Sequence, residues 1–228
     1  MTQPQHTVRI WDLPTRIFHW LLAASVIALV VTAKVGGNLM EWHLRLGHLV
    51  LALVVFRMAW GVVGGKWSRF AAFTYSPARV LRFVRGRAHP EDAIGHSPLG
   101  ALSVFALLAV LGAQLATGLV SDDEIAFSGP LTRFVSNAVV GQATSYHKDI
   151  GQYLILALVA LHVLAITYYV AVRRQQLVGP MLHGDRRLPT PAAPSRDDWS
   201  TRMLAVVVLA ASVALSWWLW SLGAAAVF

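Results

Sequence analysis

The chain has 228 residues, of which 56% are hydrophobic and 13% charged, and its formal net charge is +8. Soluble globular domains carry about 25% charged residues, so this composition excludes an ordinary soluble domain. Cysteine is absent, which excludes disulfides, thiolate-held iron–sulfur clusters and haem attached covalently through cysteine. Histidine, present nine times, is therefore the main candidate metal ligand.

Five apolar runs recur along the chain, and each approaches or exceeds the roughly 20 residues that a membrane-spanning helix needs. The first and fourth runs contain a single ionisable residue each, His19 and His162, and the third and fifth contain none. The sequence therefore predicts an all-α integral membrane protein with five transmembrane helices. Their expected ranges are 17–33, 42–63, 99–120, 150–172 and 203–228.

Most basic residues fall on one side of these spans. The N-terminus, the loop after the second span and the segment after the fourth carry them, whereas the opposite loops hold few basic residues and the acidic run 122–124. The positive-inside rule then predicts a multi-pass protein of the bacterial cytoplasmic (inner) membrane, with its N-terminus in the cytoplasm and its C-terminus in the periplasm. The basic charge indicates anionic membrane lipid, and not nucleic acid, as a partner.

Composition divides the chain into three parts. Residues 1–173 hold the first four spans and are expected to form one four-helix transmembrane unit. Residues 174–202 are basic and rich in proline, and are expected to form a cytoplasmic linker, since the stretch PTPAAP has no helical propensity. Residues 203–228 form the fifth span.

Two connecting segments have helical features of their own. Residues 76–87, SPARVLRFVRGR, place apolar residues and arginines at helical spacing, which predicts a short helix on the cytoplasmic membrane surface. A solvated basic loop is the alternative. The long outer segment 121–146 is expected to form a cap with a helix around 131–139.

Four histidines fall at two membrane depths. His43 and His147 begin spans that both enter from outside. His162 lies 15 residues beyond His147, about 22 Å along a helix, which leaves it about 8 Å from the cytoplasmic face of a 30 Å slab. His19 follows Pro14, a plausible first helical residue, by five positions and reaches a similar depth. His43 or His147 alone could be interfacial, but two pairs at two depths predict two non-covalent haems with bis-imidazole ligation.

The fourth span, HKDIGQYLILALVALH over 147–162, would supply one ligand to each haem. Fifteen residues at about 100° each bring His162 within about 60° of the helix face of His147. His19 and His43 would complete the two pairs, and an ionisable residue inside a span is a functional candidate by default.

The second span offers two candidate ligands, His43 and His48, about 140° apart on the helix. Gly47 lies on the face of His43 and leaves room for a flat macrocycle, which favours His43. Arg57, fourteen residues after His43, returns to that face. It would bind haem propionates or extend to lipid headgroups, and Arg16, three residues before His19, has the same two interpretations.

Four stretches resemble the bacterial cytochrome b-561 family, which includes the b-type subunits of membrane nickel–iron hydrogenases. They are RIFHW, WHLRLGHLVLALVVFRMAWG, GHSPLGALSV and YHKDIGQYLILALVALHV, and the resemblance covers about residues 8–173. It implies a four-helix unit that binds two b haems, one through His19 and His162 and the other through His43 and His147, with no ligand from the third helix.

The sequence departs from the family pattern in two places. The usual spacing of the ligands on the fourth helix is fourteen residues and here it is fifteen, which a single-residue π-bulge would absorb. The fifth helix lies outside the common unit.

The predicted function is that of a dihaem b-type cytochrome, which carries electrons across the membrane between the quinone pool and a redox partner. That partner would be a periplasmic or membrane-bound protein, hydrogenase-like or a c-type cytochrome, so the chain would be the membrane subunit of an oxidoreductase complex. Candidate quinone positions are the rim of Arg16, Arg57 and His96, or Gln114 and Thr117 on the third span. A stand-alone superoxide:quinone oxidoreductase and a non-redox membrane protein with a histidine-lined polar path are the alternatives.

Overall fold

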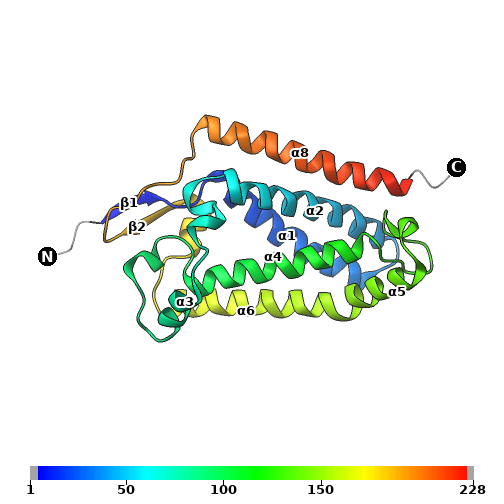
Figure 1. Cartoon of the computed structure of the whole chain (residues 1–228), viewed down its shortest axis with the longest axis horizontal. Coiled ribbons are helices and arrows are strands. Elements are labelled where there is room, and N and C mark those ends of the chain that lie inside the picture. Colours follow the sequence, from blue (N-terminus) through cyan, green and yellow to red (C-terminus); the bar gives the residue numbers. More distant parts are fainter. Residues whose placement is uncertain (1–4, 225–228) are drawn as a thin grey trace. The chain divides into compact units, whose positions relative to one another are not determined.

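The computed structural model describes residues 5–224. Within these residues, five helices are long and apolar enough to cross a membrane, so the predicted all-α membrane architecture is confirmed (Figure 1). The predicted fifth span runs to residue 228, and its end, 225–228, lies outside the described residues. The five long helices are α1 Leu13–Val35, α2 Leu39–Val63, α4 Pro98–Gly118, α6 Gln152–Ala171 and α8 Trp199–Ala224.

The fourth span is one continuous helical stretch with a π-helix inside it. Helix α5 (Asn137–Ser145) passes into the π-helix Tyr146–Gly151, which passes into α6, so the stretch runs over Asn137–Ala171. A π-turn holds one residue more than an α-turn. The π-bulge that the fifteen-residue spacing of His147 and His162 requires is thereby confirmed.

The helix expected around 131–139 has different bounds in the structure. A 3-10 turn covers Thr132–Phe134, and α5 begins at Asn137 after its N-cap Ser136, whose hydroxyl accepts a hydrogen bond from the Val139 amide. The serine cap starts the helix later than predicted, because its side chain replaces the carbonyl partner that a first-turn amide lacks.

The connection between α2 and α4 contains short helices, among them α3 (Pro77–Val84). Ser76 caps α3 by accepting a hydrogen bond from the Arg79 amide, and Pro77 occupies the first turn. Such a cap stabilises a helix by about 1 kcal/mol. The short helix predicted within 76–87 is confirmed, and a loop conformation for this stretch is wrong. The 3-10 turns of the same connection are Lys66–Ser68, Phe70–Ala72 and Pro90–Ala93.

The helices pack as two compact units, each built from three separate segments. Unit 1 comprises Met1–Phe18, Arg57–Ala106 and Ala160–Val206, and unit 2 comprises His19–Phe56, Leu107–Val159 and Val207–Phe228. These units follow packing, whereas the division at residues 173 and 202 follows composition, and the two schemes cut the chain at different places.

Unit 1 contains a two-stranded ribbon that the sequence did not predict. Strand β1 (His6–Arg9) pairs antiparallel with β2 (Asp185–Leu188), so that His6 lies opposite Leu188 (Figure 1). A short helix, α7 (Val178–His183), precedes β2. The segment 174–202 therefore contains a helix and a strand as well as the non-helical PTPAAP stretch.

A fully buried carboxylate, Asp12, fastens the start of α1 to the end of α2. It accepts hydrogen bonds from the Thr15 amide at 2.9 Å, the Trp60 indole at 3.2 Å, the Gly65 amide at 3.1 Å and the Ser68 hydroxyl at 2.7 Å. Each donor stranded by loss of this carboxylate would cost about 1–3 kcal/mol.

A second carboxylate, Asp197, joins the N-terminus to the segment before α8. Its side chain pairs with Arg9 at 2.5 Å and with Arg202 at 3.1 Å, and it accepts a hydrogen bond from the Leu13 amide at 3.2 Å. Arg9 also pairs with Asp185 at 2.6 Å. These contacts tie both strands of the ribbon to the first turn of α1.

Unit 2 has a core to which four helices contribute. Val50 and Val54 from α2 pack with Leu111 from α4 and Ile155 from α6, and residues of α1 complete the cluster. The partly buried residues around it are Leu22, Val26, Leu29, Val110, Leu115 and Val159. These helices are apolar on all sides, so they supply apolar residues both to this core and to the surface that faces lipid.

Helix α8 packs on α2 in unit 2 through polar and aromatic contacts. The Ser216 hydroxyl donates to the His48 carbonyl at 2.8 Å, and His48 Nδ1 lies 3.2 Å from the same hydroxyl oxygen. The Trp220 ring meets the His48 ring edge-on at a centroid distance of 4.6 Å. His48 is thus a packing residue of the fifth helix.

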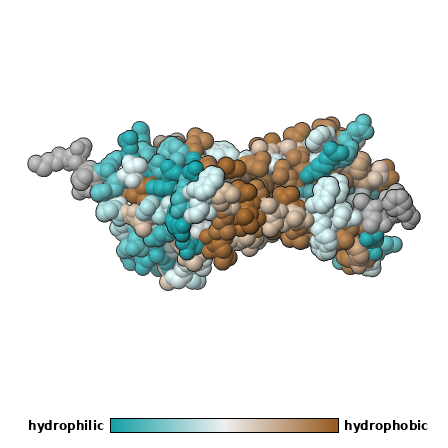
Figure 2. Space-filling model, turned by 90° about the horizontal axis from the view of Figure 1, so that it is seen from above, coloured by the Kyte–Doolittle hydropathy of each residue, from teal (hydrophilic) through white to brown (hydrophobic). Residues whose placement is uncertain are grey.

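Large apolar side chains are exposed along the long helices. Ile27 is 65% exposed, Leu164 66% and Trp217 71%, and the face drawn in Figure 2 shows a broad area of apolar side chains. A soluble monomer rarely exposes apolar patches of this extent. The exposed surface therefore suits contact with lipid chains.

Candidate functional site

His43 and His147 face each other in unit 2. His43 lies in the first turns of α2, and His147 lies in the π-helix before α6. Their ring centroids are 6.2 Å apart and their planes are nearly perpendicular, at 87°. The structure thus brings this pair of predicted ligands together.

The hydrogen bonds of the two imidazole rings determine which ring nitrogen can bind a metal. His43 Nδ1 lies 3.0 Å from the Leu29 carbonyl oxygen, and His147 Nδ1 lies 2.9 Å from the Gln114 carbonyl oxygen. A carbonyl oxygen only accepts hydrogen bonds, so Nδ1 carries the proton in both rings and donates it. Each Nε2 then presents a lone pair, as a metal ligand requires.

Gln114 on α4 holds the backbone of His147 in place. Its side-chain Nε2 donates to the His147 carbonyl at 2.9 Å. Two glycines allow this close packing, because a Cβ on Gly118 would lie 2.8 Å from His147 Cε1 and one on Gly151 would clash with the Gln114 side chain. Helix α4 supplies no candidate ligand but positions one.

The face of α2 next to His43 is open. Gly47 lies one helical turn after His43, and no atom lies within 4 Å of the position that a Cβ would take there. His48, the alternative ligand on this helix, is bound to Ser216 and Trp220 instead. Both observations favour His43.

The other predicted pair is divided between the two packing units. His19 lies on α1 in unit 2, half-buried, with the Trp20 ring edge-on at 5.1 Å. His162 lies on α6 in unit 1 and is also half-buried. The pairing of His19 with His162 stays a prediction.

Arg57 is a buried cation in unit 1. Its side chain is 3% exposed, and its guanidinium lies over the Phe70 ring at 4.6 Å. Among the described residues, its Nη1 has no hydrogen-bond partner, and the nearby Asp12 carboxylate already accepts four hydrogen bonds. This burial is inconsistent with an arginine that extends to lipid headgroups. It is consistent with an arginine whose guanidinium would pair with a bound anion.

The Arg16 side chain makes contacts within unit 1. Its guanidinium donates to the Leu182 carbonyl at 2.7 Å and lies 3.9 Å from the Asp197 carboxylate. His96 packs between aromatic rings, with Trp11 at 4.7 Å and Phe73 at 4.3 Å. Arg16 and His96 therefore do not form the open polar rim expected as a quinone position.

The polar residues of α4 make contacts within unit 2. Gln114 binds the His147 carbonyl, and the Thr117 hydroxyl bonds to the Ala113 and Gln114 carbonyls of its own helix. The Gln114 Oε1 atom is buried and accepts no hydrogen bond among the described residues, so a quinone near Gln114 and Thr117 stays a prediction.

A family model described as prokaryotic cytochrome b561 matches residues 10–184. The chain belongs to the prokaryotic cytochrome b561 family. The match includes every candidate ligand histidine, and it ends before α8. With five apolar helices, this b561 protein is a multi-pass bacterial membrane cytochrome of the electron-transport type.

The chain is also similar to curated proteins. The chain is 24% identical over 209 residues to a protein of Cupriavidus necator, a match that covers 78% of this chain and 86% of the relative. It is 25% identical over 224 residues to one of Rhizobium leguminosarum bv. viciae, with 80% and 90% covered. Both relatives are named as probable Ni/Fe-hydrogenase B-type cytochrome subunits. No solved structure gives a significant match.

The b561 family implies b-type haem, and the facing pair in unit 2 fits such a group. A metal–imidazole bond is about 2 Å long, so two imidazoles on opposite sides of one iron have ring centroids about 6 Å apart. The observed distance between His43 and His147 is 6.2 Å.

Proposed function

We propose that this b561-family protein is a dihaem cytochrome that carries electrons across the bacterial membrane between quinone and a redox partner. The observation that carries the proposal is the neighbouring pair, His43 and His147, each with Nδ1 bound to a carbonyl, which leaves Nε2 with a lone pair. Two separate helices prepare the same tautomer, which a purely structural histidine pair does not require.

His19 and His162 would hold the second haem. Support comes from their similar depth along the spans, from the family match over 10–184, and from the cost of placing unpaired ionisable groups within a membrane. A haem at each depth would divide the path of an electron across the membrane into short transfers. Bis-imidazole ligation leaves no open coordination position, which favours electron transfer over oxygen chemistry.

The chain's own residues set the properties of the haems. The four histidines would bind iron, Gln114 and the Leu29 carbonyl would orient the outer pair, and Arg57 would offset propionate charge. Bound haem supplies one-electron oxidation and reduction. The apolar helices around it exclude water and keep the site at low dielectric, where hydrogen bonds to ligands tune the potential.

The redox partner is proposed from the names of the relatives and from the charge distribution. Those relatives are named hydrogenase cytochrome subunits, so a hydrogenase-like protein is the first candidate and a c-type cytochrome the second. The basic residues favour an N-terminus in the cytoplasm and a C-terminus outside, which directs the His43–His147 end to the periplasm.

Purification in detergent followed by haem analysis tests the proposal. Acid–acetone extraction and the pyridine spectrum should give two b haems per chain, and a short-tailed quinol should reduce them. A chain without haem would be a non-redox membrane protein. A haem-loaded chain that passes electrons from superoxide to quinone without any protein partner would instead be a superoxide:quinone oxidoreductase.

A further inference from the structure

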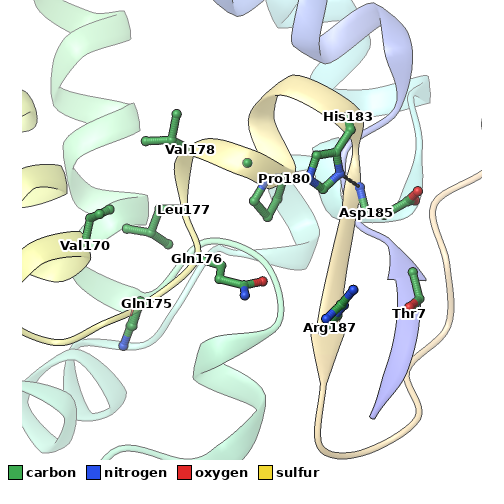
Figure 3. A pocket seen from close by; sticks show the side chains of 11 residues that line it. Thr7, Val170, Gln175, Gln176, Leu177, Val178, Pro180, His183, Asp185 and Arg187 are labelled. Carbon is green, nitrogen blue, oxygen red and sulfur yellow. Dashed lines mark hydrogen bonds between the residues drawn. The ribbon is translucent and has the colours of Figure 1, made fainter.

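A pocket of about 640 Å³ lies in unit 1 where α6, α7 and the β1–β2 ribbon meet. Apolar side chains line one part of it, among them Val170, Leu177 and Pro180, and polar side chains line another, among them Gln176, His183 and Arg187 (Figure 3). Small-molecule sites typically measure about 300–1,000 Å³ and combine apolar walls with a few polar groups. This pocket has both properties.

Several side-chain donors that line the pocket have no hydrogen-bond acceptor among the described residues. His183 Nδ1 accepts a hydrogen bond from the Asp185 amide at 3.2 Å, so the neutral ring carries its proton on Nε2 and can donate it. Within the described part of the chain, the structure gives no hydrogen bond or ion pair to the side chains of Gln176 and Arg187. In Figure 3 the Gln176 amide lies on the side of Leu177, across from His183 and Arg187.

The one carboxylate in the lining is already neutralised. Asp185 pairs with Arg9 at 2.6 Å, and this hydrogen bond holds the pKa of Asp185 below its ordinary value. The charge left to act on a ligand is therefore the Arg187 guanidinium. Amide, imidazole and guanidinium donors around an apolar wall suit a neutral ring that carries carbonyl oxygens.

The apolar side of the pocket continues onto a spanning helix. Val170 lies near the end of α6 and is 40% exposed, and Val178 at the start of α7 is 43% exposed. A ligand with an apolar tail can therefore lie along lipid-facing side chains while its polar ring enters the pocket. The apolar wall therefore favours a ligand that carries an apolar tail.

We propose that this pocket binds the headgroup of the membrane quinone. The inference rests on the proposed dihaem function and gives its quinone a location. Val170 follows His162 by eight residues on the same helix, a rise of about 12 Å. A ring in the pocket would therefore lie close to a haem held by His162, as electron transfer requires.

The reduction of quinone balances with electrons from the redox partner and protons from water. Reduction of a quinone takes two electrons, which the redox partner would supply, and two protons from water at the open side of the pocket. Both carbonyl oxygens become hydroxyls, and oxidation of the quinol returns the same electrons and protons. His183 and Gln176 donate to the carbonyl oxygens, and Arg187 stabilises negative charge until the protons arrive.

The lining favours a quinone over an anionic lipid headgroup. An anionic lipid headgroup is held best by charged donors, because charge-assisted hydrogen bonds to phosphate are about twice as strong as neutral ones. This pocket has one guanidinium free to act and a carboxylate beside it, while its remaining donors are neutral. A lipid headgroup is therefore the competing outcome of the test.

Photolabelling and quinol kinetics on the full-length holoprotein in lipid nanodiscs test the site. An azido-benzoquinone should label peptides of 170–187. His183→Ala, Gln176→Leu and Arg187→Leu should each raise the KM for a short-tailed benzoquinol about tenfold, the loss expected for one hydrogen bond of about 1.4 kcal/mol. Dithionite should still reduce the full haem content, and His183→Gln should retain part of the affinity.

Matched controls are His89→Ala and Arg82→Leu, which alter the same residue types outside the pocket and should leave the KM unchanged. The inference is overturned if all three pocket variants keep the wild-type KM, if the label maps elsewhere, or if phosphatidylglycerol protects the pocket from labelling and benzoquinol does not. A wild-type chain without haem, or one that quinol does not reduce, instead overturns the proposed function, while the labelling still tests the pocket.

Discussion

Gln114 and His147 are joined by two reciprocal hydrogen bonds between α4 and the π-helix. The His147 ring donates to the Gln114 carbonyl at 2.9 Å, and the Gln114 amide donates to the His147 carbonyl at 2.9 Å. A π-turn disturbs the regular pairing of helix carbonyls, so the amide of Gln114 stabilises the backbone at the place where the ligand ring must be oriented.

We expect Gln114→Leu to loosen the outer haem while the protein still folds. The Gln114 backbone carbonyl remains, but the π-turn loses its side-chain donor. Loss of a residue that supports a ligand typically costs about 10–100-fold in metal affinity. Haem titration should show this loss, and the low-spin electron paramagnetic resonance signal of one haem should shift.

Thr167→Val on α6 is the matched control, because the Thr167 hydroxyl bonds to the Val163 carbonyl of its own helix and is exposed. Its haem affinity and resonance signal should match those of the wild type. Unchanged haem affinity and an unchanged signal in Gln114→Leu would show that the amide does not position His147.

The π-helix could be predicted because the resemblance to the b-561 family supplies a usual ligand spacing of fourteen residues. Two histidines on one helix must share a face, and one residue beyond the usual spacing has to be absorbed locally. The choice of His43 over His48 followed from Gly47 in the same way. The structure adds the reason for His48, which packs against Ser216 and Trp220 of α8.

The ribbon and the pocket could not be predicted, because their residues carry no periodic signal. Strands β1 and β2 are four residues each, HTVR and DRRL, and lack an alternating apolar pattern. Their pairing depends on Asp197 and Arg9, far apart in the sequence. His183 likewise reads as one residue of a basic segment, and only the fold places it beside Gln176 and Arg187.

Acid should weaken unit 1 through Asp197. Burial alone would raise the pKa of Asp197, but hydrogen bonds from Arg202, the Leu13 amide and Arg9 outweigh it and lower the pKa below its ordinary value. A carboxyl with a depressed folded pKa contributes stability above its unfolded pKa, and this stability is lost as the pH falls through the folded value. The Tm in detergent should therefore lose this contribution below about pH 4.

Asp197→Asn should lower the free energy of unfolding at pH 7 by roughly 1–3 kcal/mol and flatten the acid limb of the Tm curve. Glu91→Gln is the control, because the Glu91 carboxylate is 65% exposed and pairs with Arg79 at 3.7 Å, a contact of little weight. An acid limb of unchanged steepness in Asp197→Asn would assign it to other carboxylates.

Arg57→Leu should lower the potential of one haem. A buried guanidinium favours the reduced, more negative state, so its removal should shift that potential down by about 60 mV or more, tenfold for one electron. Spectroscopic redox titration measures the shift, and Arg57→Lys should retain most of the wild-type potential. Two unchanged potentials in Arg57→Leu would show that the guanidinium pairs with neither haem.

Reporter fusions should show the orientation that the basic residues favour. Fusions after Gly65 and Arg187 are expected to report the cytoplasm, and a fusion at Phe228, outside the described residues, should report the periplasm. Alkaline phosphatase and green fluorescent protein give opposite signals on the two sides. A cytoplasmic C-terminus would contradict α8 as a membrane span.

Loss of the two histidines on the fourth span should affect different haems. His147→Ala strands His43 and should remove the outer haem, whereas His162→Ala should remove the haem shared with His19. Each variant should keep about half the haem, since an apolar bundle offers no substitute ligand, and redox titration should show a different component lost in each.

His48→Ala is the control from the same helix as His43, and it should keep both haems while loosening α8. Loss of a haem from His48→Ala together with full haem content in His147→Ala would contradict the outer pair. The 6.2 Å spacing of the His43 and His147 rings would then reflect packing alone, because the outer haem would depend on His48 and not on His147.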